Sequence, residues 1–190
     1  DPDAGISTNA YDAASNLIET VDAKHQRIRC SYDGANRMLT EDYEDEASPE
    51  FSYHRSPDVV FHYDTPAGPV DQGDGSRATA RNTKGMLAWV EDTSGREYTS
   101  FDARGRIEWT VKQIPDPVLS STLEFQPQTA VSYKTAFAHD SIDRITRIIY
   151  PDNDEVAYRY NARNLLTGIT GGPSGNILSN LTYLPSAQQE

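Results

Sequence analysis

The side chains that most often perform catalysis or bind metals are few and scattered in this sequence. The four histidines are His25, His54, His62 and His139, and none of them has a second histidine four residues away. Such a pair on one helix face is the usual beginning of a zinc site. We therefore expect each histidine to lie on a strand face or at the surface rather than to bind a metal.

Acidic side chains gather in two short stretches, Asp152–Glu155 and Asp71–Asp74. Calcium takes about six to eight oxygen ligands from a shaped loop, and the glycine that an EF-hand has at its sixth position is missing here. The single cysteine, Cys30, excludes an internal disulfide and a CxxC metal site. We expect no metal and no cofactor, and a cysteine that packs as a small apolar side chain on a strand.

The sequence also lacks the motifs of covalent and phosphate chemistry. It has no GxSxG nucleophile turn, no HExxH zinc helix and no glycine-rich phosphate loop. The nearest string, GGPSGN at 171–176, lacks the glycine two residues after Ser174 and is typical of a turn. We therefore predict a protein that is not an enzyme.

Composition and charge narrow the class of protein further. The chain has 190 residues, of which 36% are hydrophobic and 11 are tyrosine, and its net charge is −12. Because phosphate recognition depends on lysine and arginine, this charge argues against nucleic acid as a partner. No stretch approaches the roughly 18 apolar residues that a membrane-spanning helix needs. Residues 1–75 carry 5 basic and 16 acidic side chains, which fits a basic neighbour or, as we favour, a solvated surface.

A seven-residue phrase recurs along the chain and decides the fold prediction. Its seven positions hold, in order, an aromatic residue, an Asp or Asn, two variable residues, a turn-forming residue, a residue that is often Arg or Asn, and an aliphatic residue. Its copies are YDAASNL at 11–17, YDGANRM at 32–38, RNTKGML at 81–87, FDARGRI at 101–107, HDSIDRI at 139–145 and YNARNLL at 160–166, with weak copies YDTPAGP at 63–69 and YLPSAQQ at 183–189. Four of the steps between copies are 20 to 23 residues long, and the longer steps contain loop-like inserts. This regularity indicates a repeat architecture.

Between these copies, turn clusters are followed by residues that alternate in polarity. Ile28, Cys30 and Tyr32 share one side of an extended chain, as do Trp109 and Val111. Alternation with a period of two predicts half-buried strands, and no helical spacing is sustained. A period of about 21 residues accommodates two strands of roughly six residues and two turns. The predicted fold class is all-β, built from antiparallel hairpins.

The recurring phrase itself predicts a turn. The carboxylate at its second position can accept a hydrogen bond from the N–H two residues on, and Gly85 and Gly105 supply the positive φ that such a turn needs. We assign these residues to structure rather than to catalysis, because an enzyme has no use for so many copies of one site. The candidate signature residues are Tyr11, Asp12, Tyr32, Asp33, Tyr63, Asp64, Gly85, Phe101, Asp102, Gly105, His139, Asp140, Tyr160 and Asn161.

These phrases resemble the repeats of the Rhs or YD-repeat family over nearly the whole chain, about residues 11 to 189 without the inserts. The stretch YPDNDEVAYRYNARNLLTGI at 150–169 looks especially like the repeats in the B–C components of bacterial Tc toxins. Arg81-Asn82, His139-Asp140 and Tyr183-Leu184 depart from the Tyr-Asp pair. In this family the repeats join into a β-ribbon that spirals into a hollow shell. The resemblance therefore implies a curved ribbon of antiparallel hairpins, an arc of such a shell.

Three inserts interrupt the repeats, near 43–62, 65–80 and 114–132. Their proline and glycine residues end strands, so we expect surface loops or extra hairpins, and residues 51–63 could hold one of these hairpins. We divide the chain into a lead-in at 1–10 and a repeat segment at 11–190. Since the sequence starts Asp-Pro-Asp, we interpret it as a fragment of a much larger protein.

The resemblance also raises one catalytic alternative. Bacterial Rhs shells often end in an aspartic self-cleavage site, which is marked by two DPxG-type phrases after the repeats. Here Asp1-Pro2 and Asp116-Pro117 are not followed by that glycine and do not lie after the repeats. We expect no autoproteolysis within these residues.

The function that the resemblance implies is a structural one. We expect a non-catalytic part of a β-shell that encapsulates a C-terminal toxin passenger for delivery, within a secreted or cell-surface bacterial protein. Its partners would be the neighbouring repeats and the enclosed toxin domain. The alternative is an extracellular adhesion module that binds a receptor or a glycan, which exposed aromatic residues in the inserts would favour. We also expect the isolated chain to form an open sheet that associates through its edges or with a second copy.

Overall fold

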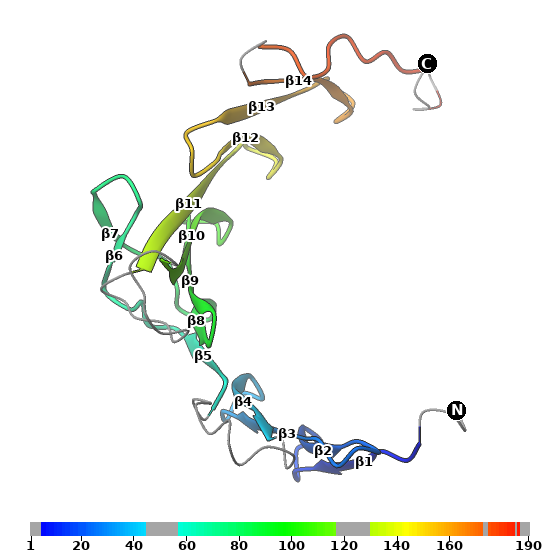
Figure 1. The fold of residues 1–190 in the computed structure, drawn as a ribbon. Coiled ribbons are helices and arrows are strands. Elements are labelled where there is room, and N and C mark those ends of the chain that lie inside the picture. The colour runs from blue at the N-terminus through cyan, green and yellow to red at the C-terminus, as the bar shows by residue number, and fades with distance from the viewer. Residues whose placement is uncertain (1–4, 45–56, 117–129, 173–174, 185, 187–190) are drawn as a thin grey trace. The chain divides into compact units, whose positions relative to one another are not determined.

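The computed structural model describes residues 5–44, 57–116, 130–172, 175–184 and 186. All regular secondary structure in these residues is β, with fourteen strands and no helix (Figure 1). The prediction of an all-β chain is confirmed. The strands are β1 Thr8–Tyr11, β2 Leu17–Val21, β3 Arg27–Tyr32, β4 Met38–Glu44, β5 Val59–Tyr63, β6 Pro69–Asp71, β7 Arg77–Thr79, β8 Leu87–Asp92, β9 Gly95–Phe101, β10 Ile107–Pro115, β11 Ala130–His139, β12 Ile145–Ile149, β13 Glu155–Tyr160 and β14 Leu166–Gly171.

Twelve of the strands form one sheet, and its strand order follows the sequence. The order is β1-β2-β3-β4-β5-β8-β9-β10-β11-β12-β13-β14, so each strand lies beside the next one along the chain once β6 and β7 are set aside. Every pairing with a defined register is antiparallel. Strands β6 and β7 form a separate two-stranded hairpin. This succession of hairpins is the arrangement that the repeats predicted.

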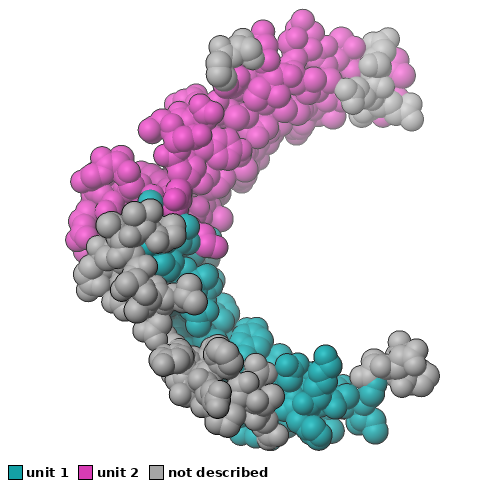
Figure 2. Space-filling view, viewed as in Figure 1, with its two compact units in different colours: residues 1–66, 83–98, 113–131 teal, residues 67–82, 99–112, 132–190 magenta. Residues whose placement is uncertain are grey.

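The chain divides into two compact units, which Figure 2 distinguishes by colour. Unit 1 comprises Asp1–Pro66, Thr83–Tyr98 and Gln113–Val131, and it contains β1–β5 and β8. Unit 2 comprises Ala67–Asn82, Thr99–Lys112 and Ser132–Glu190, and it contains β6, β7 and β12–β14. The boundaries fall within β9, β10 and β11, so these three strands contribute residues to both units.

In unit 1 the first four strands have a polar face that carries ion pairs. Arg29 lies opposite Glu19 of β2 and Asp42 of β4. Its guanidinium donates to Glu19 Oε2 at 3.2 Å and to Glu44 Oε1 at 2.6 Å. None of the side chains of β1–β4 is buried. Because solvent-exposed ion pairs stabilise a protein only slightly, the backbone ladder and the turns must provide most of the order in these hairpins.

The buried side chains of the described residues all lie between Val70 and Gln113. They are Val70, Gln72, Ala80, Thr83, Ala88, Glu91, Tyr98, Ser100, Phe101, Trp109, Val111 and Gln113. In unit 2, Ser100 of β9 and Val111 of β10 are both 0% exposed. Thr83, Ala88, Glu91, Tyr98 and Gln113 are thus the buried side chains of unit 1, and the others are the core of unit 2.

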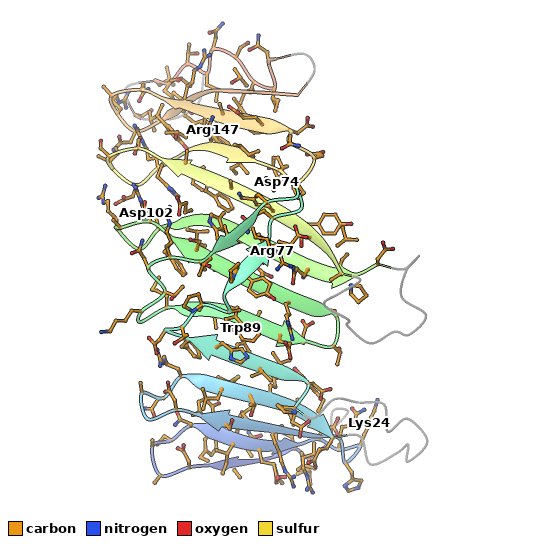
Figure 3. All side chains as sticks on the ribbon, turned by 90° about the vertical axis from the view of Figure 1, so that its left-hand side faces the viewer. Lys24, Asp74, Arg77, Trp89, Asp102 and Arg147 are labelled. Atoms are coloured by element: carbon orange, nitrogen blue, oxygen red, sulfur yellow. The ribbon has the colours of Figure 1, made fainter. Side chains whose placement is uncertain are left out.

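The hairpin β6–β7 covers this core in unit 2, where Figure 3 shows Asp74 and Arg77 in front of the sheet. Beyond β7, Arg81 N–H donates to Ser100 Oγ at 3.0 Å. The turn of the hairpin lies on β11 so closely that a Cβ on Gly73 would lie 2.4 Å from the Ser132 carbonyl oxygen. Gly73 also has a φ of +84°, so glycine is needed there on both grounds.

The predicted inserts agree only partly with these elements. The second insert, 65–80, contains the extra hairpin β6–β7, as expected. The first insert, near 43–62, was placed too widely, because β4 continues to Glu44 and β5 begins at Val59. The third insert, near 114–132, was also too wide, since β10 ends at Pro115 and β11 begins at Ala130.

The expected hairpin within 51–63 is wrong for its described half. Strand β5 lies in the main sheet, where Val59 pairs with Glu41 of β4 and Phe61 pairs with Val90 of β8. The alternation of Val59, Phe61 and Tyr63 therefore belongs to a strand of the repeat sheet rather than to an insert. Phe51 and Tyr53, as well as His54, lie outside the described residues.

Candidate functional site: the repeat corners

The recurring phrase forms a tight turn between two strands, which we call a corner and number from position 1 to position 7. In each continuous corner the N–H of position 2 donates to the carbonyl oxygen of position 6. These hydrogen bonds are Asp12–Asn16 at 2.9 Å, Asp33–Arg37 at 2.9 Å, Asp102–Arg106 at 2.8 Å, Asp140–Arg144 at 3.0 Å and Asn161–Leu165 at 2.9 Å. The structure contains six such corners, five of them continuous in sequence. The five continuous corners share one local geometry.

The side chain at position 2 holds the corner from inside. Asp33 Oδ1 accepts the N–H of Ala35 at 2.8 Å and the N–H of Arg37 at 3.0 Å. The same pair of hydrogen bonds forms at the second position of the other continuous corners. One side-chain oxygen thus satisfies two N–H groups that have no strand partner, which fixes the turn locally. The predicted Asx-type turn is confirmed in these corners.

Position 5 is left-handed in every corner. Its residues are Ser15, Asn36, Gly85, Gly105, Asp143 and Asn164, with φ between 60° and 82°. Glycine, asparagine and aspartate adopt this conformation at the lowest cost, which explains the composition of this position. Gly85 and Gly105 were expected there from the sequence, and the other four corners have Ser15, Asn36, Asp143 and Asn164 at this position.

A register shift accompanies each corner whose strand pairing is defined. Tyr32 pairs with Met38 directly after Ser31 has paired with Thr40, so one residue of β4 has no partner. The same shift occurs at the corners that begin with Tyr11, Tyr63, His139 and Tyr160. Such a bulge increases the local twist of a hairpin and allows positions 1 and 7 to face each other across the turn.

One corner is split by the inserted hairpin. The N–H of Asp64 donates to the carbonyl oxygen of Met86 at 3.1 Å, as position 2 does to position 6 elsewhere. Asp64 Oδ1 accepts the N–H of Gly85 at 2.6 Å, and Tyr63 pairs with Leu87 across the sheet. Thr83 Oγ1 donates to the Asp64 carbonyl oxygen at 2.8 Å, which holds the two halves together. Tyr63-Asp64 and residues 83–87 therefore form a single corner.

This split corner corrects two of the predicted copies. The phrases at 63–69 and 81–87 are two halves of one copy, so Arg81-Asn82 does not occupy the Tyr-Asp positions. Instead, the N–H of Phe101 donates to the Arg81 carbonyl oxygen at 3.0 Å, and Asn82 Nδ2 donates to the Phe101 carbonyl oxygen at 2.8 Å. Lys84-Gly85-Met86-Leu87 does form the second half of a corner, and for this reason the sequence suggested a complete copy at 81–87.

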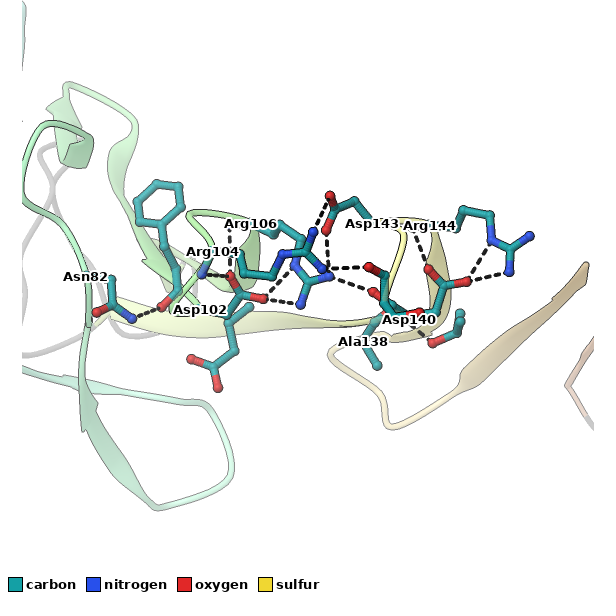
Figure 4. Close-up of polar contacts among 12 residues, drawn as sticks. Asn82, Asp102, Arg104, Arg106, Ala138, Asp140, Asp143 and Arg144 are labelled. Carbon is teal, nitrogen blue, oxygen red and sulfur yellow. Dashed lines mark hydrogen bonds and ion pairs between the residues drawn. The ribbon is translucent and has the colours of Figure 1, made fainter. Parts of the chain in front are cut away.

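Arginine at position 6 connects successive corners, as Figure 4 shows for unit 2. Arg106 Nε donates to Asp102 Oδ2 of its own corner at 2.6 Å. Its Nη1 donates to the Asp140 carbonyl oxygen at 2.7 Å and to Asp143 Oδ1 at 2.8 Å in the next corner. Arg104 Nη2 also donates to Asp143 Oδ2, at 3.0 Å. One guanidinium thus joins two adjacent turns by charge-assisted hydrogen bonds.

The same connection recurs elsewhere in both units. Arg144 Nη1 donates to Asn164 Oδ1 at 3.0 Å in unit 2. In unit 1, Asn16 Nδ2 donates to Asn36 Oδ1 at 2.9 Å, and Arg37 Nη2 donates to Asp64 Oδ2 at 2.8 Å. Asn and Asp at position 5 therefore do two things, since they adopt the left-handed conformation and accept a hydrogen bond from the preceding corner.

The aromatic residue at position 1 makes two further contacts with the preceding corner. The guanidinium of Arg37 lies 4.5 Å from the centre of the Tyr63 ring, and that of Arg144 lies 4.5 Å from the centre of the Tyr160 ring. Tyrosine hydroxyls donate to the carbonyl oxygen of position 7, as Tyr160 does to Ile145 at 2.9 Å. Tyr32 and Tyr183 make the equivalent hydrogen bonds to Leu17 and Leu166. Tyrosine is thus suited to this position by both its ring and its hydroxyl.

The corner contacts keep the carboxylates ionised. Hydrogen bonds from the Arg106 side chain and from the backbone lower the pKa of Asp102 to about 2. The Arg37 side chain, followed by the Gly85 N–H, lowers the pKa of Asp64, and the hydrogen bonds to Asp64 and to Asp33 raise the pKa of Arg37. A general acid that acts near neutral pH needs a raised pKa. The electrostatics of the corners therefore suit the holding of arginine rather than proton transfer.

All signature residues fall in corners, but sequence reasoning missed the residues that join one corner to the next. Arg37, Arg106 and Arg144 were noted only as a frequent residue type at position 6. The recurrence of arginine at this position was the signal that could have predicted these links. A guanidinium can bind the Asp of the same corner and an acceptor in the next corner at once. Phe101 occupies position 1 without a hydroxyl, and His139 also replaces tyrosine there.

Among the described residues, the other side chains that were considered for catalysis or metal binding make structural contacts. The His62 ring stacks on Trp89, with ring centres 3.4 Å apart and an angle of 2°. Asp71 and Asp74 accept N–H hydrogen bonds in the β6–β7 turn, and Asp152 accepts that of Asp154. The part of the chain that the structure describes holds no group of three His, Cys, Asp or Glu side chains placed to bind a metal. None of its segments is a helix long and apolar enough to cross a membrane.

Together, the meander of hairpins and the repeated corners form an antiparallel β-ribbon. The crystal structure of TcdB2–TccC3 matches this fold with a TM-score of 0.74 and 15% identity, over 98% of this chain and 9% of that chain. The TcdB2–TccC3–Cdc42 structure matches with a TM-score of 0.73 and 16% identity, over the same shares of the two chains. The Tc holotoxin pore of Photorhabdus luminescens, with a substituted TccC3, matches with a TM-score of 0.72 and 15% identity, over 98% of this chain and 9% of that chain.

These matches show the fold, and the fold agrees with the Rhs/YD resemblance of the sequence, since the matched structures contain an Rhs/YD shell. The chain spans about a tenth of the length of the matched chains, which are 9% covered. No protein-family model matches the chain, and no curated protein matches its sequence.

Proposed function

We propose that this chain is a wall segment of a hollow β-shell made of Rhs/YD repeats, and that its role is structural rather than catalytic. The observation that carries the proposal is the fold match over 98% of the chain to structures of TcdB2–TccC3. In this proposal the shell belongs to a much larger secreted or cell-surface bacterial protein. It encloses a C-terminal toxin passenger until delivery, and the neighbouring repeats are the direct partners of the chain.

The corners support this role physically. Each hairpin is joined to the next by strand hydrogen bonds and by side chains such as Arg106, which binds two corners. A repeat protein of this kind extends by adding units, and each added unit satisfies the strand edge of the one before it. The result is a continuous wall rather than a cleft with a reactive group.

The alternative of a receptor- or glycan-binding module receives less support from the described residues. Trp89 is the aromatic ring best suited to stack on a sugar, but His62 stacks on it at 3.4 Å and Tyr98 lies 6.0 Å from it. The second insert, 65–80, contains no aromatic residue. Exposed tyrosines do occur, at Tyr11, Tyr43, Tyr133 and Tyr150, but they are distributed over β1, β4, β11 and the turn after β12. A binding module of this type would be expected to gather free aromatic faces in one place.

Under this proposal the chain is part of a longer polypeptide, and the enclosure is tested on that polypeptide. We expect the C-terminal passenger to resist trypsin, and to become cleavable when Val111→Asp places an unpaired charge in the core of unit 2. Arg77→Gln, which changes an exposed residue of β7, is the matched control and should leave the passenger protected. Equal cleavage of the passenger in the wild type and in Val111→Asp would contradict enclosure.

A glycan array with the 190-residue chain tests the alternative. The wall proposal predicts no specific glycan ligand. Saturable binding of one glycan that is lost on Trp89→Ala would support the adhesion function instead.

A further inference from the structure

The links between successive corners do not all come from the same position. In four cases the donor is the side chain at position 6, which is Asn16, Arg37, Arg106 or Arg144. In the split corner and in the last continuous corner, position 6 is Met86 and Leu165, whose side chains have no hydrogen-bond donor. After these two corners, a link to the next corner must come from another residue.

Asn82 and Arg81 contact the corner Phe101–Ile107, which is the next one along the chain after Met86. Asn82 Nδ2 donates to the Phe101 carbonyl oxygen at 2.8 Å, and Arg81 Nη2 donates to Glu108 Oε1 at 2.5 Å (Figure 4 shows the Asn82 contact). The N–H of Phe101 donates in turn to the Arg81 carbonyl oxygen at 3.0 Å. All of these residues belong to unit 2, and the two that directly follow the inserted hairpin hold the first position of this corner.

The corner Phe101–Ile107 also lacks an acceptor that other corners have. Its position 5 is Gly105, which has no side-chain oxygen, whereas Asn36 and Asn164 accept the hydrogen bond of the preceding corner at this position. A missing donor and a missing acceptor thus coincide, and Asn82 binds a backbone carbonyl instead.

Arg163, at position 4, provides the link where position 6 is Leu165. Tyr183 is position 1 of the following corner, because its hydroxyl makes the hydrogen bond to the preceding corner that tyrosine makes at this position elsewhere. Arg163 Nη1 donates to the carbonyl oxygen of Leu184, at position 2, at 3.3 Å. Arg106 donates to the position 2 carbonyl of its own following corner at 2.7 Å. The receiving atom is therefore equivalent, although the donor comes from another position.

We propose that Asn82, together with Arg81, and Arg163 are positioning residues of the wall, which hold the next corner where position 6 has no donor. This inference rests on the proposed wall function and gives a role to residues outside the signature of the phrase. The physical reason is that the carbonyl groups at positions 1 and 2 lie where the strand ladder ends. Each of them has a lone pair that a donor from outside the corner can use.

Amide exchange at Leu178 and Leu181 in the 190-residue chain tests Arg163, because these two N–H groups hold the following segment on β14 at 3.0 Å and 3.1 Å. Arg163→Gln should speed their exchange about two- to fivefold, as the loss of one exposed charged contact implies. Arg159→Gln makes the same change of charge at an exposed position of β13 and should leave the exchange unchanged. Equal acceleration in both variants would overturn the inference.

A second substitution returns the donor to position 6. Leu165→Arg, added to Arg163→Gln, should restore the slow exchange, whereas Leu165→Met, which provides no donor, should not. Leu165→Arg with Arg163 intact is the control and should exchange like the wild type. If that control holds and the double variant still exchanges fast, positions 4 and 6 are not equivalent and the proposal is wrong.

The Phe101 N–H tests Asn82 independently, because it donates to the Arg81 carbonyl oxygen. Asn82→Asp keeps the size of the side chain and tolerates the left-handed φ of 53°, but it replaces the donor by an acceptor. It should speed exchange at Phe101 about two- to fivefold. Asn153→Asp makes the same change at a left-handed residue of the β12–β13 turn, with φ of 67°, and should have no effect at Phe101. Unchanged exchange at Phe101 in Asn82→Asp would overturn the inference and leave intact the wall function, which the resistance of the passenger to trypsin tests.

Discussion

The hairpins β1–β4 and the strands β9–β10 are built from the same repeat, yet different interactions hold them together. In β1–β4 none of the side chains is buried, and the strands carry ion pairs such as Arg29–Glu44. In β9–β10 the core includes Ser100 and Val111, which are 0% exposed. The difference comes from the hairpin β6–β7, which covers one face of unit 2. The corners thus set the geometry of the ribbon, and an insertion into one corner adds a core to it.

The largest expected effect comes from removing a core side chain. Trp109 of β10 is 7% exposed, and Trp109→Ala should lower the free energy of unfolding by about 3–5 kcal/mol. Ile18 of β2 is 37% exposed, so Ile18→Ala should lower it by less than about 1 kcal/mol. Urea unfolding followed by circular dichroism measures both. Equal losses would mean that the two regions are not stabilised differently.

Removal of the inserted hairpin should erase the difference between the regions. Deletion of residues 65–82 joins Asp64 to Thr83, whose hydroxyl already donates to the Asp64 carbonyl oxygen at 2.8 Å. The product has a continuous corner of the sequence YDTKGML. Because Val70 and Ala80 no longer cover the sheet, stability should fall by about 2–3 kcal/mol while the all-β spectrum persists.

Val70→Asp in the full chain is the control for this deletion, since it should expose the same core without shortening the chain. Loss of the β spectrum in the deletion variant alone would show that the split corner needs its insertion. Unchanged stability in both variants would show that the hairpin does not form part of the core.

A smaller effect is expected where one arginine joins two corners. Arg106→Gln removes the hydrogen bonds to Asp102, Asp140 and Asp143, and the unfolding equilibrium constant should rise about two- to fivefold. Arg159→Gln makes the same change of charge at an exposed position of β13 and should have no measurable effect. If the two variants have the same unfolding equilibrium constant, arginine at position 6 contributes only its charge.

The smallest effect is a dependence on pH that appears only in acid. The pKa of Asp102 is lowered to about 2, below the value of about 3.9 in an unfolded chain. A lowered pKa stabilises the folded state above the unfolded value, and this stabilisation is lost as the pH falls from about 4 to about 2. The midpoint temperature of thermal unfolding should therefore be constant between pH 7 and pH 5 and should fall below pH 4. Asp102→Asn should reduce this acid dependence, and a full dependence in that variant would contradict its assignment to Asp102.

The corners were predictable from the sequence because their hydrogen bonds are local. Asp33 binds the N–H groups two and four residues on, so the phrase YDGANRM contains both partners. The strands were predictable for the same reason, since alternation of polarity is a local property. Strand β5 shows the limit of this reasoning: Val59 and Phe61 were expected in an insert, and only their partners Glu41 and Val90 place them in the sheet.

The split corner and the links between corners were beyond local reasoning. Asp64 binds Gly85 across 21 residues, and Arg106 binds Asp143 across 37 residues. Such pairs depend on which hairpins lie side by side, and the recurring phrase does not state this. The division into a lead-in at 1–10 and a repeat segment at 11–190 stays a prediction.

Amide exchange measured residue by residue tests the central claim that six equivalent corners, one of them split, organise the chain. The account predicts slow exchange at the second position of every corner, which is Asp12, Asp33, Asp64, Asp102, Asp140 and Asn161, because each of these N–H groups donates across its turn. Fast exchange at Asp64 together with slow exchange at Asn82 would show instead that residues 81–87 form a corner of their own, and would contradict it.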